Sequence, residues 1–186
     1  VLGIKHWKAA DQQECFVCYS LFDAFDMAVH YAYLERECRF VKSVPLEIEL
    51  EGIGKLRVIS AGAASLRCEL PVRLRDLRAW MPVLTRINPQ EIELSHLIIP
   101  DLSDRHALRR VLASMISVWK PSLDLEAVAE LVANAERAVL AENIRYYERL
   151  SDAIRRELEG APTLARSIVE MAQLQLRVLQ SYHFSD

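Results

Sequence analysis

A long helix without interruption constrains the fold of this chain more than any other feature of its sequence. From Leu123 to about Glu159 there is neither glycine nor proline, and Gly160-Ala161-Pro162 separates this stretch from a second helical pattern over Thr163 to about Tyr182. At ~1.5 Å per residue the first helix would be roughly 50 Å long, which exceeds the diameter of a domain of this size. We therefore expect part of it to protrude from the body or to meet a partner.

The expected long helix carries an apolar seam with the three-and-four spacing of heptads. The candidate oligomerisation residues on this seam are Leu125, Val128, Val132, Ala135, Val139 and Tyr146. A second apolar stripe on the same helix includes Leu140, Ile144 and Ile154. Since one further helix cannot cover both stripes, the sequence predicts a homo-oligomer, with a tetramer as one candidate size, which Val132→Asp would break. The alternative is a helical hairpin that folds onto the rest of its own chain.

Strand patterns precede these helices. Leu46–Leu50 and Leu56–Ser60 alternate apolar and charged residues on either side of Gly52-Ile53-Gly54. With Gly52, Ile53 and Gly54 as the hairpin loop, Leu50 would face Leu56, and Glu49 would face Arg57. A further turn at Gly62-Ala63-Ala64 would add Leu66–Leu70 as a third strand beside the second one. The outer face would then carry a charge ladder of Glu49, Arg57 and Glu69.

Three further elements are expected along the chain. A second hairpin, roughly Arg78–Thr85 with Glu91–Ile99, would turn at Asn88-Pro89-Gln90. Pro100-Asp-Leu-Ser103 would then end the strand and cap a helix from about Asp104 to Trp119. Near the start, apolar residues at intervals of three and four predict a helix from about Asp11 to Glu37.

Two short motifs flank the first expected strands. Arg36-Glu-Cys-Arg39 precedes the first strand, and Val58-Ile-Ser60-Ala-Gly62-Ala63 covers the second turn. In this arrangement, about residues 36–118 resemble the PilZ domain, the small β-barrel family of bacterial cyclic di-GMP receptors. That family usually carries Arg-x-x-x-Arg before the first strand and Asp/Asn-x-Ser-x-x-Gly at the second turn. The resemblance implies that Arg36, Arg39, Ser60 and Gly62 correspond to ligand-binding positions.

The resemblance implies a barrel over about residues 36–118, and the helices expected from periodicity lie outside it. Together they give the expected fold class. It is an α+β fold with a small PilZ-like antiparallel β-barrel, an N-terminal helix and a long C-terminal helical extension. The expected parts are an N-terminal helical segment over 1–35, the barrel with its closing helix over 36–120, and a long helix and helical hairpin for oligomerisation over 121–186.

Both motifs depart from the pattern of that family. If Arg39 matches the second arginine, Glu35 stands in the place of the first, and Arg36 is displaced by one residue. In the second motif Val58 replaces the acid, and Ala63 replaces the final glycine. Guanidinium groups bind phosphates bidentately, so a glutamate near a phosphate repels it, and valine accepts no hydrogen bond from a guanine edge. We therefore expect cyclic di-GMP to bind weakly or not at all, and we expect no other cofactor.

A PilZ-like domain with a heptad-bearing helix is similar to the atypical, non-binding PilZ proteins of plant-pathogenic xanthomonads, which oligomerise through a long added helix. This implies a cytoplasmic adaptor that contacts itself and other signalling or pilus proteins in motility, type IV pilus function or virulence. Two alternatives stay open. One is a functional cyclic di-GMP receptor, and the other is a peptide-binding module that uses a sheet edge such as Leu46–Leu50.

Other classes of function find less support. The five histidines show no nucleophile–base spacing and no phosphate-binding loop occurs, so we expect no enzyme. Cys15-x-x-Cys18 with His30 and Cys38 matches no compact zinc knuckle, so we expect no metal. A net charge of -3 argues against a nucleic-acid partner. No apolar run approaches the ~20 residues that span a bilayer, and the start lacks a signal-peptide pattern.

Overall fold

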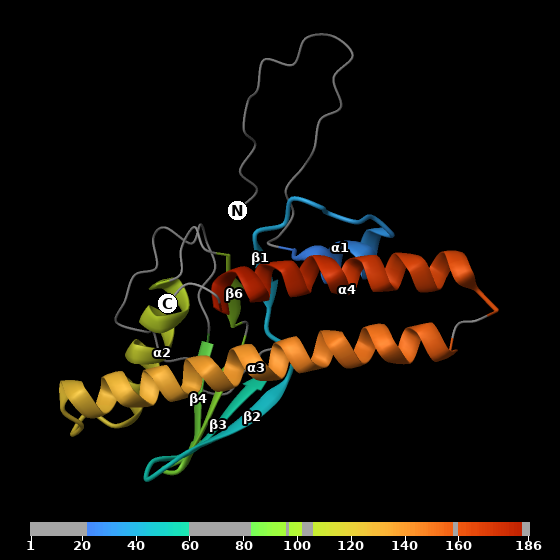
Figure 1. The fold of residues 1–186 in the computed structure, drawn as a ribbon. Helices are drawn as coiled ribbons and strands as arrows, with labels where there is room; N and C mark the ends of the chain where they lie inside the picture. Colours follow the sequence, from blue (N-terminus) through green and yellow to red (C-terminus); the bar gives the residue numbers. More distant parts are fainter. Residues whose placement is uncertain (1–21, 60–82, 96, 102–105, 158–159, 184–186) are drawn as a thin grey trace, which may run out of the picture.

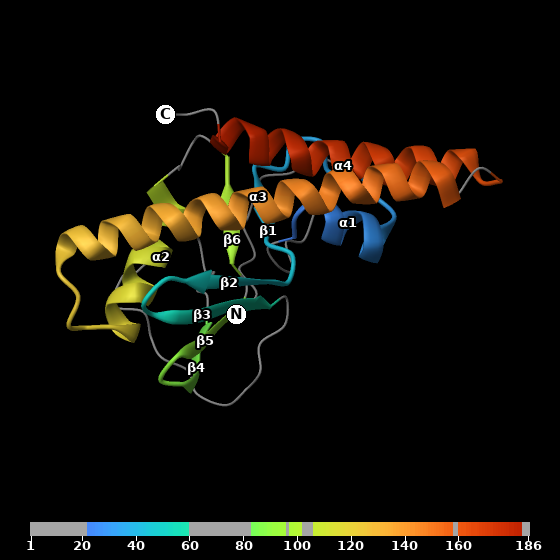
Figure 2. The same cartoon turned by 60° about the horizontal axis from the view of Figure 1, so that its bottom comes forward.

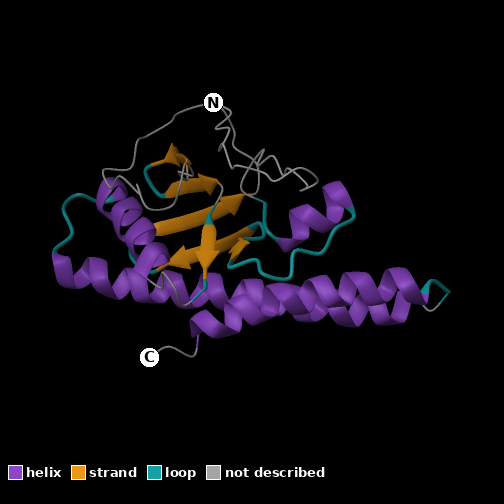
Figure 3. Ribbon diagram, turned by 90° about the horizontal axis from the view of Figure 1, so that it is seen from above, coloured by secondary structure: helices purple, strands orange, loops and turns teal. Residues whose placement is uncertain are grey.

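The protein is an α+β molecule in which two small sheets lie against long helices (Figures 1 and 3). The computed structural model describes residues 22–59, 83–95, 97–101, 106–157 and 160–183. The described elements, in chain order, are α1 (Ala24–Tyr31), β1 (Phe40–Lys42), β2 (Leu46–Leu50), β3 (Gly54–Ile59), β4 (Val83–Asn88), β5 (Glu91–Ser95), β6 (Ile98–Pro100), α2 (His106–Trp119), α3 (Leu125–Glu157) and α4 (Pro162–His183). The expected α+β class is confirmed.

The β2–β3 hairpin is present, but its register differs from the expected one. Leu50 pairs with Gly54 instead of Leu56, so residues 51–53 form the loop. The reason lies at Gly54, where φ is +131° and any Cβ atom would overlap the carbonyl of Gln90. That carbonyl accepts a hydrogen bond of 2.7 Å from the Lys55 amide, so the two backbones lie very close together at this point. Only glycine fits there, and Gly54 becomes the first residue of β3 instead of the last residue of the loop. Because the pairing moves by two residues, each side chain keeps its expected face.

The neighbours of β3 also differ from expectation. β3 lies between β2 and β5 in the four-stranded sheet β2-β3-β5-β4, and it runs parallel to β5. The prediction that Leu66–Leu70 pairs with β3 is therefore wrong, because both edges of β3 are already occupied. The segment Leu66–Leu70 and the expected turn at 62–64 lie outside the described residues. Strands that are adjacent in sequence usually pair, and nothing in this sequence signals the crossover that brings β5 beside β3.

The second expected hairpin is confirmed in its turn and pairing. β4 and β5 pair antiparallel on either side of the turn at Pro89 and Gln90, while residues 78–82 lie outside the described part. The strand expected to reach Ile99 is divided, since β6 leaves the sheet and pairs with β1, placing Val41 opposite Ile99. The described strands thus form two separate sheets, and they do not close into a barrel.

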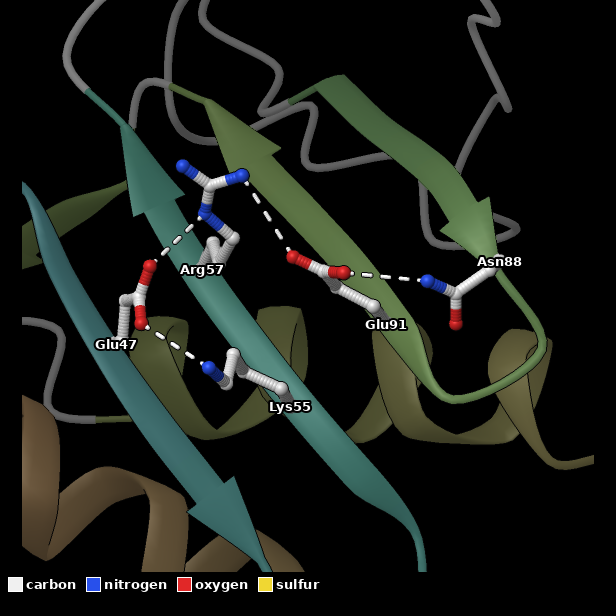
Figure 4. Close-up of polar contacts among 5 residues, drawn as sticks. All are labelled: Glu47, Lys55, Arg57, Asn88 and Glu91. Atoms are coloured by element: carbon white, nitrogen blue, oxygen red, sulfur yellow. Dashed lines mark hydrogen bonds and ion pairs between the residues drawn. The ribbon is translucent and has the colours of Figure 1, made fainter.

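One hydrophobic core joins the sheets to the helices. Leu56 of β3, Leu108 of α2, Val139 of α3 and Leu179 of α4 are all fully buried members of the same cluster. Figure 4 shows α2 and α3 behind the four-stranded sheet, on the face opposite the charged side chains. The core therefore continues across residue 120, where a boundary between barrel and helical extension was expected.

The helical third of the chain forms an antiparallel pair of α3, with 33 residues, and α4, with 22. Asp124 starts α3 by accepting a hydrogen bond of 2.8 Å from the Ala127 amide. The loop end of this pair extends past both sheets (Figure 2). None of the described helices is long and apolar enough to cross a membrane.

The N-terminal helix is shorter than expected. α1 ends at Tyr31, since Ala32 adopts a left-handed conformation with φ of 52° and its amide closes the last turn on Ala28. The expected continuation to Glu37 is therefore wrong, and the expected beginning at Asp11 lies outside the described residues.

Candidate functional site

The two candidate ligand arginines lie in the loop between α1 and β1. Arg36 is 70% exposed and forms an ion pair with Glu170 of α4, with Nη2 2.8 Å and Nε 3.0 Å from the same carboxylate oxygen. Arg39 has an exposed side chain, and its backbone carbonyl accepts a hydrogen bond of 2.7 Å from the Asp101 amide. The charge of Arg36 is therefore already balanced by a carboxylate of its own chain.

Only the first two residues of the second candidate motif, Val58 and Ile59, lie among the described residues. Val58, at the position where the PilZ pattern has an acid, is 1% exposed and lies in the core opposite Leu94. Ser60 and Gly62 lie outside the described residues. The described part of this motif therefore adds no polar side chain to a ligand surface.

The outer face of the four-stranded sheet carries a network of paired charges (Figure 4). Glu47 contacts both Lys55, at 3.3 Å, and Arg57, at 3.1 Å. Arg57 reaches Glu91 at 3.6 Å, and the Asn88 amide donates to Glu91 at 3.1 Å. A ladder through Arg57 was expected, but its acids are Glu47 and Glu91 instead of Glu49 and Glu69 because of the changed register and strand order. These exposed pairs balance one another, and each contributes at most about 1 kcal/mol.

The heptad seam of α3 divides into a covered part and an exposed part. Val132, Ala135 and Val139 are buried within a single chain, with exposed fractions of 7%, 0% and 0%. These three residues cannot form a contact between copies while the chain keeps this fold, so their assignment to an oligomer surface is corrected. Leu125 is 88% exposed and Tyr146 is 41% exposed. Val128 is partly buried against the same core, so the seam is apolar chiefly because its middle part packs into the core of its own chain.

The partly exposed continuation of this seam is the best candidate site. Tyr146, Leu150 and Ala153 follow Val139 at steps of seven, four and three, which keeps them on the same helix face. We call these three residues the distal flank. They belong to the C-terminal half of α3, the half that leads to the loop end of the helical pair. Leu164, in the first turn of α4, adds a further apolar side chain that is 55% exposed at that end.

Two buried polar residues fix α3 to the body. Asn143 accepts a hydrogen bond of 2.9 Å from the Val44 amide and donates one of 3.0 Å to the Ser43 hydroxyl. These bonds bring the segment between β1 and β2 onto the helix. Sequence reasoning missed this anchor, and its only signal was a polar residue within an apolar stripe.

The second anchor is Glu136, which is only 4% exposed. Arg109 of α2 lies 2.7 Å from its Oε2, and the Tyr182 hydroxyl of α4 donates to its Oε1. A buried carboxylate needs such partners, so this group links three helices. Its role is structural.

Cysteine and histidine form no metal site among the described residues. Cys38 is a free thiol that donates to the Phe40 carbonyl at 3.2 Å, and burial raises its pKa. The His30 ring lies 5.9 Å from the Phe22 ring, within a small aromatic cluster. Cys15 and Cys18 lie outside the described residues. Comparisons with family models, curated proteins and solved structures gave no match to this chain.

Proposed function

We propose that this chain is a non-enzymatic bacterial signalling adaptor with an atypical PilZ-like domain. In this proposal it binds cyclic di-GMP weakly or not at all, self-associates through its helical hairpin and acts through protein partners in motility, type IV pilus function or virulence. The observation that supports it best is the distal flank in the C-terminal half of α3, where the apolar seam is exposed at Tyr146.

A second copy of the chain is the partner that the distal flank suits first. Tyrosine is enriched in the centres of protein interfaces, and the half-buried Leu150 beside it adds apolar area. Charged pairs such as Arg145 with Glu142, at 2.5 Å, border this surface as a polar rim. Two copies related by a two-fold axis would each present the same flank, so the surface would be complementary to itself.

Light scattering on purified protein tests the self-association. We expect more than one chain per particle for the wild type, and we expect Tyr146→Lys to weaken association at least about tenfold by placing a charge in the apolar centre. Glu148→Lys is the matched control, because Glu148 is exposed on the opposite side of the same helix. A wild type that is monomeric at micromolar concentrations would remove this part of the proposal.

Calorimetry with cyclic di-GMP tests the ligand part. Arg36 is engaged by Glu170, and Val58 is buried, so two positions that would hold phosphate and guanine are not free to do so. We expect no binding with a Kd below about ten micromolar. A tighter Kd would favour the alternative of a functional receptor.

A further inference from the structure

α1 is a short helix that lies on α4 and contributes little to the core. It has 8 residues, and isolated helices of that length are unstable in water. Ala24 is its one buried residue, while Phe25 and Ala28 are half-buried against the core. Val29 and Tyr31 are 61% and 52% exposed. α1 must therefore be held in place mainly by contacts at its ends.

The main contact is the carboxylate of Asp23. Its Oδ1 accepts a hydrogen bond of 2.9 Å from the Asp26 amide and so caps α1, while its Oδ2 accepts one of 2.8 Å from the Lys42 amide of β1. The Lys42 ammonium also lies 2.5 Å from Asp26. Beyond the other end of α1, Arg36 contacts Glu170 of α4 on the exposed surface. One buried carboxylate thus ties α1 to the body.

The surface beneath α1 is polar and poorly satisfied. Asp23 is 1% exposed, and burial raises the pKa of its carboxyl more than its two backbone donors lower it. Gln175 of α4, which is 0% exposed, lies beside that carboxyl and also lowers its pKa, though less than the two backbone donors do. Neither atom of its side-chain amide makes a hydrogen bond of normal geometry with a described residue. Burying an amide without a well-formed hydrogen bond opposes folding, so closure of α1 over Gln175 is opposed by that amide, whereas the two bonds of Asp23 favour closure.

We propose that α1 is a detachable strap that opens from α4 without unfolding of the rest of the chain. In the closed form α1 covers Asp23 and Gln175, and in the open form both groups regain water. Opening uncovers the side of α4 that carries Gln175 and so exposes a surface that the closed form hides. This inference depends on neither self-association nor nucleotide binding.

Amide hydrogen exchange of the full chain tests the strap. We expect the amides of Met27 and Lys42 to be protected at least ~100-fold less than those at the centre of α3, because they exchange through a local opening. Equal protection at both places would overturn the proposal, since α1 would then open only when the whole chain unfolds.

Two variants separate the strap from a structural anchor. Gln175→Met keeps the length of the side chain and removes the amide, so we expect about tenfold slower exchange in α1 and no change at the centre of α3. Gln173→Met is the matched control, because Gln173 is exposed on the same helix and should change neither. Unchanged or faster exchange of α1 in Gln175→Met would overturn the proposal, because closure would then not be opposed by the amide.

Asp23→Ala is the second variant, and it removes the acceptor of both backbone bonds. Exchange should become at least about tenfold faster at Met27 and Lys42 while the centre of α3 keeps its protection. If the centre of α3 loses protection by the same factor, α1 belongs to the global folding unit and the strap does not exist.

Discussion

Gly54 shows how a single backbone position determines the way two hairpins meet. Its φ of +131° and the adjacent carbonyl of Gln90 leave no room for a Cβ atom, whereas Gly52, with φ of +72°, has nothing within 4 Å of that position. The two glycines therefore have different roles. Gly52 supplies the left-handed conformation that the turn requires, and Gly54 permits the contact between the β2–β3 and β4–β5 hairpins.

Replacing Gly54 by alanine should destabilise the fold by about 2 kcal/mol or more, because the new methyl group would overlap backbone that cannot move aside easily. Gly52→Ala is the control, and it should cost only about 1 kcal/mol, which is the expense of a left-handed conformation for alanine. Urea unfolding followed by circular dichroism measures both changes. Equal losses in the two variants would show that the approach of Gln90 does not constrain the hairpin.

At the scale of elements, sequence periodicity predicted the helices and the strand faces well. The turn at Pro89, the interruption at Gly160 and the faces of β2 and β3 all follow from local patterns. The strand order could not be predicted, because the neighbour of β3 is set by a crossover that leaves no local signal. The end of α1 at Ala32 was also missed, because the left-handed conformation of one alanine leaves no local signal in the sequence either.

The candidate site was predicted only in part, and α3 shows why. A heptad pattern records that one face of a helix is covered, but it does not say whether the cover belongs to the same chain or to another copy. Val132 and Val139 are covered by their own chain, while Tyr146 on the same face is exposed. The difference depends on which parts of α3 the other elements of the chain cover, and that follows from tertiary packing.

At the scale of the whole molecule, the sheets, α2 and the helical hairpin share one core, so the hairpin cannot be removed as an independent part. Asn143 and Glu136 add buried hydrogen bonds across the junctions between these elements. A change in the covered part of the α3 seam should therefore affect folding of the entire chain, whereas a change in its exposed part should leave folding intact.

Val132→Asp tests this coupling. The sequence alone predicts that this variant breaks an oligomer, whereas the structure predicts that it destabilises the fold of the single chain. Val132 is 7% exposed, so an aspartate there would bury an unpaired charge, and we expect a loss of about 3 kcal/mol or more in the free energy of unfolding. Leu125→Asp is the matched control on the same seam, since Leu125 is 88% exposed and its loss should stay within about 0.5 kcal/mol. Urea unfolding, followed by both circular dichroism and tryptophan fluorescence at concentrations where the chain is monomeric, separates the two. A Val132→Asp protein that unfolds like the wild type but no longer associates would show that the seam contacts another copy and that its cover within the chain is not needed for folding.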